Sequence, residues 1–499
     1  MDDPFKVLRP HAGSYAKALA GEASARGLLT TAADDSRRPI PPGATPIVLR
    51  PEVIDGRHRL AHTLADAGFR MAQAVVRGPR REDLLGALSP LERRLVEHSA
   101  PHMRRLAIAR IDFLVSARPM ALELNATIPA MPGYSDMAAG AFLEVVGRYA
   151  GLDQRRRQAL VRANGSNVEA LHRALVHGFA LERGRLPNRI AVLCRRHDSQ
   201  LSEVEHLVSR FAELGTEARR VYPDEASGTD LFMAHGLAFD LVYRHLFVHR
   251  LSETPSPFLE SLFAGEAAPG SLVLNGPAPH IEAKNNFALL SRAVAEPSLA
   301  EAAGLDAEAL EAIAAAVPWT RSLVRGPTRG PGGESIPELV AHVAAHPASF
   351  VLKRAWDYGG KAVFVGPAAD EPGFANRSVA AFGAPLPWAD LVERAAEDRR
   401  GGGFVVQATV DVPRAQHLLA TEAGAVEAEV YVDYSAFTSV GVRPEPQWGG
   451  VVRASSSRVV NIQGGGGVLP LLRAPVWEEL RRALPAESAV RSGVVGGGS

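Results

Sequence analysis

Two lysines flank a glycine-bearing loop in the segment VLKRAWDYGGKAVFVG at positions 351–366. The chain has 55 Lys and Arg residues, of which fifty are arginines and five are lysines, namely Lys6, Lys17, Lys284, Lys353 and Lys361. A position that keeps lysine against this background favours a compact, rotatable ammonium group over a planar guanidinium group. Between Lys353 and Lys361, Gly359 and Gly360 permit backbone N–H groups to approach phosphate oxygens closely. The loop therefore predicts a phosphate-binding site, and a glycine-turn hairpin with two exposed cations is the alternative.

Other polar residues are candidates for the same nucleotide site. Lys284 stands at an expected helix start, where a solvated lysine is ordinary, and its rarity is what favours a site. Gln407 ends the expected strand in GGGFVVQATVDVP and is either a strand-terminal polar residue or part of an adenine-binding hinge. The tract GGVVRASSSRVVNIQGGGG either forms a flexible loop or covers phosphates. Its candidate phosphate or substrate residues are Arg453, Asn461, Gln463, Gly464 and Gly465.

A β-hairpin is predicted by two alternating apolar segments in RIDFLVSARPMALELN at positions 110–125. With the turn at its centre, Asp112 opposes Glu123 and Arg110 opposes Asn125. Two opposed carboxylates on one face repel each other, and a divalent cation would remove that repulsion. Carboxylate and amide oxygens suit Mg²⁺, which keeps its other positions for water and phosphate. The pattern fits a Mg²⁺ site of Asp112, Glu123 and Asn125 or, equally, an amphipathic hairpin with a wet face.

The elements that must position these residues read as a mixed α/β fold. RIAVLC, EARRVY and FDLVYR are expected strands, and a helix with apolar residues at helical spacing follows the first of them and ends at Gly215. This order predicts a parallel α/β unit of Rossmann type, without the GxGxxG loop of a dinucleotide site. Further strands are expected at FVLKRA, KAVFVG, GFVVQAT, AEVYVDY and SRVVNIQ.

The chain is expected to divide into five regions. The N-terminal region is helical, with one helix starting at Ser89-Pro90. The regions are the helical segment 1–104, the hairpin with its following loop and helices at 105–185, the Rossmann-like region 186–280, the lysine and nucleotide region 281–475, and a C-terminal helix with a flexible tail at 476–499.

Composition restricts the class of function. The 55 basic and 55 acidic residues cancel, so nothing indicates a nucleic acid or an anionic membrane as a partner. Cys194 is the single cysteine, which excludes an internal disulfide framework and a Cys-based zinc cluster and favours a reducing cytoplasm. The sequence has neither an apolar run long enough to cross a membrane nor an N-terminal export signal, so we expect no membrane insertion.

The order of these motifs resembles a circularly permuted ATP-grasp protein, of the group that includes glutathionylspermidine synthase and its uncharacterised bacterial relatives. In usual ATP-grasp enzymes the lysine strands come first, whereas here the hairpin precedes Lys353 by more than two hundred residues. RIDF followed by LELNATIP is similar to the metal-binding hairpin of the synthase. FVLKRAWDYGGKAVFVG resembles the lysine strand and phosphate loop, FVVQATVDVP the adenine hinge, and GGVVRASSSRVVNIQGGGG the glycine tract of the relatives.

The resemblance implies a permuted ATP-grasp fold with a Rossmann-like pre-ATP-grasp domain, and an ATP-dependent ligase that joins a carboxylate to an amine through an acyl phosphate. ATP and Mg²⁺ would be the cofactors, with small-molecule or peptide substrates. By the same match, Arg110 contacts the transferring phosphoryl group, and Asp112, Glu123 and Asn125 hold Mg²⁺. An ATP-grasp phosphotransferase and a nucleotide-binding scaffold without enzymatic activity are the alternatives.

One departure from the synthase pattern limits what can be carried over. Thr127 replaces the acidic residue expected after Asn-Ala, so the polyamine and glutathione sites of the synthase are not transferred to this chain. Two segments are candidate substrate walls: PAMPGYSDM at 129–137 and YRHLFVHR at 243–250, the latter at the end of an expected parallel strand.

Overall fold

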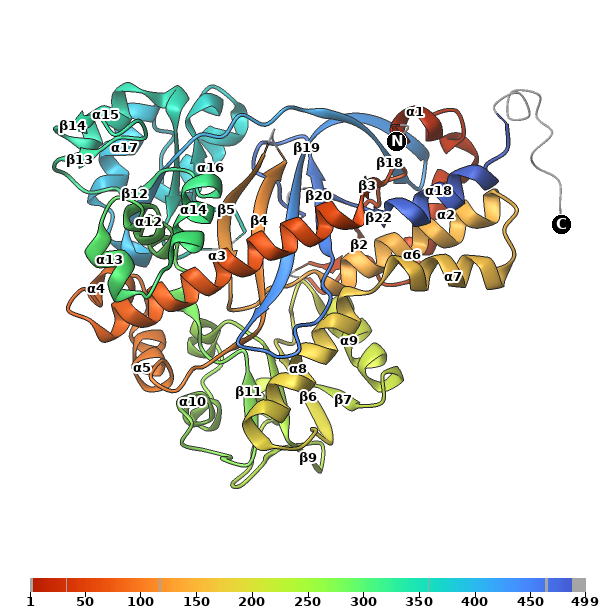
Figure 1. Ribbon diagram of the computed structural model, residues 1–499, viewed down its shortest axis with the longest axis horizontal. Helices are drawn as coiled ribbons and strands as arrows, with labels where there is room; N and C mark the ends of the chain where they lie inside the picture. Colours follow the sequence, from red (N-terminus) through yellow and green to blue (C-terminus); the bar gives the residue numbers. More distant parts are fainter. Residues whose placement is uncertain (1–2, 33, 116–117, 358, 463–464, 487–499) are drawn as a thin grey trace.

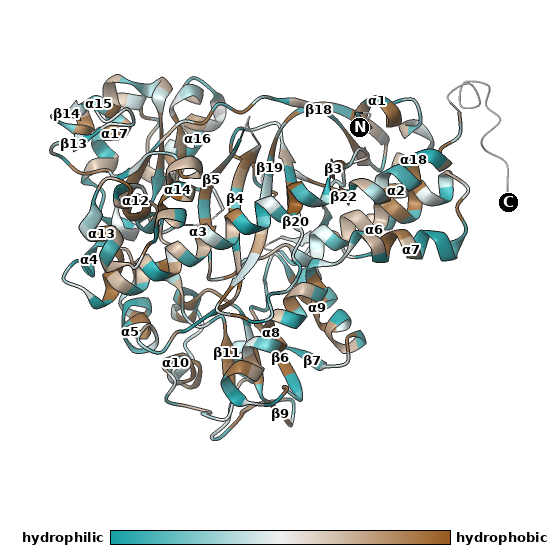
Figure 2. Cartoon of the chain, in the orientation of Figure 1, coloured by the Kyte–Doolittle hydropathy of each residue, from teal (hydrophilic) through white to brown (hydrophobic). Residues whose placement is uncertain are grey.

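The computed structural model describes residues 3–32, 34–115, 118–357, 359–462 and 465–486. These residues form a mixed α/β fold in which 18 α-helices surround three main sheets (Figure 1). Figure 2 shows hydrophobic residues concentrated in the strands of these sheets, with hydrophilic residues along the outward sides of the helices. None of the described helices combines the length and apolarity needed to cross a lipid bilayer.

The N-terminal part is mainly helical. It contains α1 (Pro4–Leu8), α2 (Ala12–Ala25), α3 (Pro51–Arg77), α4 (Glu82–Leu85) and α5 (Pro90–Ser99), with the short strands β1 (Leu29–Thr31), β2 (Arg37–Pro39) and β3 (Ile47–Leu49). Helix α5 begins where the sequence predicts, because Ser89 and Glu92 form a capping box that satisfies free N–H groups at its start.

A six-stranded antiparallel sheet, here called the hairpin sheet, lies at the centre of the molecule. Its strands are β4 (Leu106–Val115), β5 (Pro119–Asn125), β18 (Ala415–Thr421), β19 (Gly424–Val440), β20 (Gly450–Ser455) and β21 (Gly467–Leu469). The order is β21-β20-β19-β4-β5, with β18 on β19. The apolar side of α3 packs on one face, and α2 with α6 (Pro132–Tyr149) covers part of the other face, whose remaining part carries Arg110, Asp112 and Glu123 and is open to a cavity.

The predicted hairpin is confirmed. In the β4–β5 pair, Asp112 lies opposite Glu123 and Arg110 lies opposite Asn125. The register then shifts, since Phe113 pairs with Ala121 and leaves Leu122 as the extra residue of a β-bulge. The sheet combines strands from residues 106–125 with strands from residues 415–469, so segments far apart in the sequence meet here.

A second sheet is wholly parallel. It contains β6 (Arg189–Cys194), β7 (Glu217–Val221), β10 (Leu241–His245) and β11 (Leu272–Leu274) in the order β11-β10-β6-β7. Helix α9 (Leu201–Glu213) connects β6 to β7, and α10 (Pro257–Ala264) lies between β10 and β11 in the chain. The three strands and the helix predicted for residues 189–245 are confirmed.

A third sheet, the lysine sheet, is antiparallel in the order β12-β17-β15-β16. Its strands are β12 (Thr320–Ser322), β15 (Phe350–Arg354), β16 (Val363–Val365) and β17 (Phe404–Ala408). Leu352 and Val406 point to a core with α15 (Leu339–Ala345), α16 (Pro372–Phe382) and α17 (Trp388–Glu397). Because side chains alternate along a strand, Lys353 and Gln407 face the opposite side.

Several elements connect these sheets. The helices are α7 (Gln154–Asn164), α8 (Asn167–Arg183), α11 (Pro279–Glu282), α12 (Lys284–Ala293), α13 (Pro297–Ala302), α14 (Ala307–Ala316) and α18 (Ala474–Ala483). The strands are β8 (Phe232–Ala234), β9 (Leu237–Phe239), β13 (Thr328–Arg329), β14 (Ser335–Ile336) and β22 (Leu471–Arg473).

The strand predicted at SRVVNIQ is wrong for the residues that can be described. Strand β20 ends at Ser455, and residues 457–462 form a loop. The Ser455 side chain accepts a hydrogen bond from the Ser457 amide, and the Ser457 side chain accepts one from the Val459 amide. Serine side chains that bond the nearby backbone compete in this way with strand pairing.

Candidate functional site

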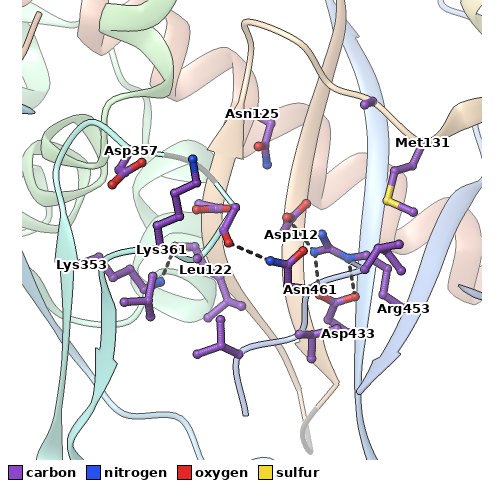
Figure 3. Close-up of a pocket in the computed structure, with 18 of the residues that line it drawn as sticks. Asp112, Leu122, Asn125, Met131, Lys353, Asp357, Lys361, Asp433, Arg453 and Asn461 are labelled. Carbon is purple, nitrogen blue, oxygen red and sulfur yellow. Dashed lines mark hydrogen bonds and ion pairs between the residues drawn. The ribbon is translucent and has the colours of Figure 1, made fainter. Parts of the chain in front are cut away.

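A cavity of about 710 Å³ lies where the three sheets meet. It brings together these residues predicted from the sequence: Arg110, Asp112, Glu123, Asn125, Lys284, Lys353, Gly359, Gly360, Lys361, Gln407, Arg453 and Asn461. Gly465 is described but is not among the lining residues, and Gln463 and Gly464 lie outside the described residues. Figure 3 shows Lys353 and Lys361 on one side of the cavity and Arg453 with two aspartates on the other.

Lys353 extends from the lysine sheet towards the hairpin sheet. Its Nζ atom donates to Oε1 of Gln407 at 2.8 Å and to the carbonyl oxygen of Leu122 at 3.2 Å. Leu122 is the bulged residue of β5, so the bulge turns a backbone carbonyl towards the ammonium group. Burial lowers the pKa of Lys353 to about 8, because an enclosed site disfavours the charged form.

Lys284, at the first position of α12, links the lysine loop to the hairpin. Its Nζ atom donates to the carbonyl oxygen of Asp357 at 2.8 Å and lies 3.5 Å from Oε2 of Glu123. A backbone hydrogen bond from its own amide to the Ala355 carbonyl holds the start of the helix against the loop. The ammonium group of Lys284 is therefore held between the lysine loop and the β4–β5 hairpin.

The glycine loop is shaped by its backbone. Gly359 and Gly360 have φ angles of 69° and 70°, which L side chains rarely adopt. A Cβ atom on Gly360 would lie 2.7 Å from Cγ1 of Val459, so the position has no room for a side chain. Asn461 donates from Nδ2 to the Gly359 carbonyl oxygen at 2.8 Å. The loop at 459–461 thus packs directly on the glycine loop.

Two arginines and two aspartates form a buried network on the hairpin sheet. Arg110 binds Asp112 with two hydrogen bonds, from Nε to Oδ1 at 2.7 Å and from a terminal nitrogen to Oδ2 at 3.0 Å. Arg453 donates to Oδ2 of Asp112 at 2.9 Å and to both oxygens of Asp433, at 3.0 and 2.6 Å. A further terminal nitrogen of Arg110 donates to the Ala130 carbonyl at 2.8 Å.

The two aspartates of this network differ in their acidity. Burial raises the pKa of Asp112, but Arg110 and Arg453 outweigh it and hold that pKa well below its ordinary value. For Asp433, burial prevails and raises the pKa above its ordinary value although Arg453 opposes it. Asp433 was not among the residues predicted from the sequence. The available signal was an acidic residue within the apolar strand AEVYVDY.

The donor set fits Mg²⁺ in part. Glu123 is about one-third exposed to the cavity, and Nδ2 of the Asn125 amide has no hydrogen-bond partner within the described part of the chain. Nδ2 is a hydrogen-bond donor and cannot bind the cation, but the Glu123 carboxylate and the side-chain oxygen of Asn125, both at the cavity wall, are oxygen ligands of the kind that hold Mg²⁺ together with phosphates and water. Asp112 is 2% exposed and both of its oxygens accept from guanidinium groups, so here it serves as the partner of two arginines. Among the described residues, no three His, Cys, Asp or Glu side chains form a metal-binding group.

Two carboxylates hold segments that form the cavity wall and were not predicted as site residues: Glu282 is partly buried and Glu92 is buried. Glu282 accepts the backbone N–H groups of Ala126 and Thr127 at 2.9 and 2.6 Å, which fixes the end of β5, and burial raises its pKa. The carboxylate oxygens Oε1 and Oε2 of Glu92 accept hydrogen bonds from Nε1 of Trp356 at 3.1 and 3.2 Å. Oε1 also lies 3.3 Å from Nδ1 of His249. The hydrogen bonds from Trp356 to Glu92 thereby attach the lysine loop to α5.

Neither a protein-family model nor a curated protein matches this chain. Among solved structures, a glutathione synthetase-like effector from Globodera pallida, in its apo form, superposes with a TM-score of 0.56 at 12% identity, covering 95% of this chain and 98% of that chain. A Methylobacillus flagellatus KT protein, whose suggested activity is that of a gamma-glutamylcysteine synthetase, gives a TM-score of 0.36 at 10% identity, covering 87% and 96%. The first comparison shows a shared fold.

Proposed function

We propose that this protein is an ATP-dependent ligase that joins a carboxylate to an amine and releases ADP and phosphate. The observation that carries the proposal is the composition of the cavity. Lysines from the lysine sheet and from α12 lie on one side, and the oxygen donors and arginines of the hairpin sheet lie on the other. The shared fold with a glutathione synthetase-like protein supports the same class of reaction.

ATP would lie between the lysine sheet and the hairpin sheet. Val351, Val363 and Val365 line the cavity beside Gln407 and offer an apolar surface for adenine. Lys353 and Lys361, with the backbone of the glycine loop, would hold the phosphates. Bound Mg²⁺ would supply a positive charge shared by the phosphates, with Glu123 and Asn125 as its protein ligands. The ligand role of Asp112 remains a prediction that depends on rearrangement of its arginine contacts.

The reaction has two balanced steps. An oxygen of the substrate carboxylate attacks the γ-phosphorus, the bond to the bridging oxygen breaks, and ADP leaves. The amine nitrogen then attacks the acyl carbon, phosphate leaves with the electron pair of the C–O bond, and the nitrogen loses a proton. Catalysis of this kind consists mainly of positioning and electrostatic stabilisation.

Arg110 and Arg453 are suited to orient the transferring group. Each guanidinium is fixed by carboxylate partners, and the formal charges of the two arginines and two aspartates cancel. The network therefore directs N–H groups without adding net charge, and the lysines provide the excess positive charge. Electrostatic stabilisation is strongest when such donors are oriented before the reaction begins.

The chain order is part of the proposal. The hairpin at 106–125 precedes the lysine strands at 350–408, yet both line one cavity. This supports the proposal that the chain is a permuted ATP-grasp enzyme. The parallel sheet within 186–280 would then be the pre-ATP-grasp domain. Both assignments extend the resemblance noted in the sequence.

Two measurements test the proposal. Saturating Mg-ATP should raise the melting temperature, because a ligand at a hundredfold excess over its Kd stabilises the folded state by about 2.7 kcal/mol. Addition of an amine together with a carboxylate substrate should then release ADP. Unchanged melting at millimolar Mg-ATP would refute nucleotide binding. ADP leaves before the amine reacts, so the test is repeated turnover, and multiple-turnover ADP release that is equally fast with and without an amine would refute ligation.

A further inference from the structure

The cavity continues beyond the nucleotide region to the carboxyl edge of the parallel sheet. The loop that follows β6 contributes residues 195 and 197–200 to its wall, and the loop that follows β10 contributes Phe247 and Arg250. Arg38, which belongs to β2, lines the same end. No part of this region is required to hold ATP in the proposal above.

These two loops leave the sheet at a topological switch point. In the sheet order β11-β10-β6-β7, the chain leaves β6 towards β7 at one edge of the sheet. It leaves β10, the neighbour of β6 on the other side, towards β11 at the opposite edge. Ile190 and Val192 of β6 pack in the same core as Val204 of α9. The alternate β6 residues Ala191 and Leu193 pack with Leu259 of α10. The helices therefore cover opposite faces and the loops diverge, which leaves a crevice between them. Parallel sheets bind their ligands at such a crevice.

The crevice is positively charged. Among the described lining residues of these two loops and of β2 are three guanidinium groups, those of Arg38, Arg195 and Arg250, and one carboxylate, that of Asp198. Nε of Arg195 lies 3.5 Å from Oδ2 of Asp198, and Oδ1 of Asp198 accepts the Gln200 amide, so this carboxylate is already engaged. Arg250 pairs with Glu253, which is half exposed and is not among the lining residues. A cationic ligand would meet like charges here.

We infer that the crevice binds an oxyanion carried by the substrate, a carboxylate or a phosphate group that is distinct from the reacting carboxylate. Arg195 and Arg250 are the specificity-determining residues, because a guanidinium group matches an oxyanion with two parallel N–H donors. The substrate is then a small polyanion whose reacting carboxylate points towards Arg110. This inference rests on the proposed function for naming the occupant as the acyl donor, and the charge of the crevice does not depend on it.

The experiment uses the full chain, three small probes and a matched control. Binding of glutarate, inorganic phosphate and spermidine is followed by thermal shift and calorimetry for the wild type, Arg195→Gln, Arg250→Gln and Arg196→Gln. Arg196 is adjacent to Arg195 but pairs with Asp224 and does not line the cavity. We expect Arg195→Gln and Arg250→Gln to weaken anion binding at least tenfold, with Arg196→Gln near the wild type.

The outcomes separate the alternatives. Stabilisation by glutarate assigns the site to a carboxylate, and stabilisation by phosphate alone assigns it to a phosphorylated substrate. No stabilisation by either anion, equal binding by Arg195→Gln and Arg196→Gln, or binding of spermidine in their place overturns the inference. Mg-ATP is titrated against the same proteins. If the wild type binds the anions but not Mg-ATP, the proposed function is rejected and the anion site is retained.

Discussion

Nζ of Lys353 lies 2.8 Å from Oε1 of Gln407, and both of its hydrogen-bond acceptors are uncharged. Gln407 is directly opposite Val351 on the neighbouring strand, so Lys353 reaches it diagonally across the sheet. Gln407 is held in turn by its donor bond to Oγ1 of Thr320 at 3.1 Å. Because amide and carbonyl oxygens orient the ammonium group without neutralising it, its charge remains available to an anionic ligand.

Nucleotide binding should depend on pH through Lys353. Its pKa of about 8 lies below the ordinary value of 10.5 because the group is buried, so the ammonium form is lost as the pH rises through 8. Bound phosphates favour the charged form and raise the pKa again. We expect about half a proton to be taken up by Lys353 per nucleotide bound near pH 8, and weaker binding above it. Calorimetry in buffers of different ionisation enthalpy measures this uptake. The uptake measured with Lys353→Met gives the contribution of ATP itself, which is subtracted from that of the wild type. Identical proton uptake by the variant and the wild type would contradict the assignment to Lys353.

Lysine at the two loop positions should be required beyond its charge. We expect Lys353→Arg and Lys361→Arg each to lower turnover by roughly tenfold or more, because a broad planar guanidinium group does not fit a crowded phosphate site. Steady-state ADP release measures the effect. Lys17→Arg is the control, since Lys17 lies on α2 and does not line the cavity. Full activity in both loop variants would mean that these lysines only reflect composition.

The two opposed carboxylates of the hairpin should behave differently when neutralised. Glu123 is partly exposed, so Glu123→Gln should abolish Mg²⁺-dependent turnover and leave the melting temperature nearly unchanged. Asp112 is 2% exposed, and its carboxylate accepts hydrogen bonds from Arg110 and Arg453. In Asp112→Asn the two buried guanidinium groups lose a charged acceptor, which should lower the free energy of unfolding by about 3–5 kcal/mol. Denaturant unfolding of both variants distinguishes them. Equal stability of the two would show that the arginine network is not formed in solution.

Trp356 should act as a positioning residue for the lysine loop. Trp356→Phe removes its hydrogen bond to Glu92, while Ser89 and His249 still contact that carboxylate. We expect a stability loss of about 1 kcal/mol and a several-fold weaker affinity for Mg-ATP. Trp319→Phe is a matched control, because Trp319 donates to the Arg329 carbonyl and does not line the cavity. An unchanged ATP affinity for Trp356→Phe, or an equal loss in both variants, would argue against the role.

Local patterns in the sequence predicted the parts of the fold that depend on neighbouring residues. The prediction that Asp112 lies opposite Glu123 is confirmed, although the pairs nearest the turn are shifted by one residue and only the bulge at Leu122 restores the predicted register. The predictions of β6 and α9, whose periodicity is clear, are also confirmed. The loop at 457–462 was misjudged because its apolar residues resemble a strand, whereas serine side chains redirect the backbone.

The contacts missed from the sequence are those between distant segments. Asp433 becomes part of the site because β19 lies next to β4 and carries it to Arg453 and Asp112. The bond between Trp356 and Glu92 joins residues 264 positions apart. Such pairings follow from the packing of sheets and helices, which no local pattern encodes. For the same reason, the engagement of Asp112 by Arg453 could not be anticipated from the hairpin alone.

The proposed function requires that the free energy of ATP hydrolysis is used to join two molecules. The most direct measurement is mass spectrometry of cell extract incubated with the protein, ATP and Mg²⁺, with Lys353→Met as the inactive control. The account predicts ADP, phosphate and a new compound whose mass equals two extract components less one water, all absent from the control. Formation of AMP and pyrophosphate, of a phosphorylated product without condensation, or of no product at all would contradict it.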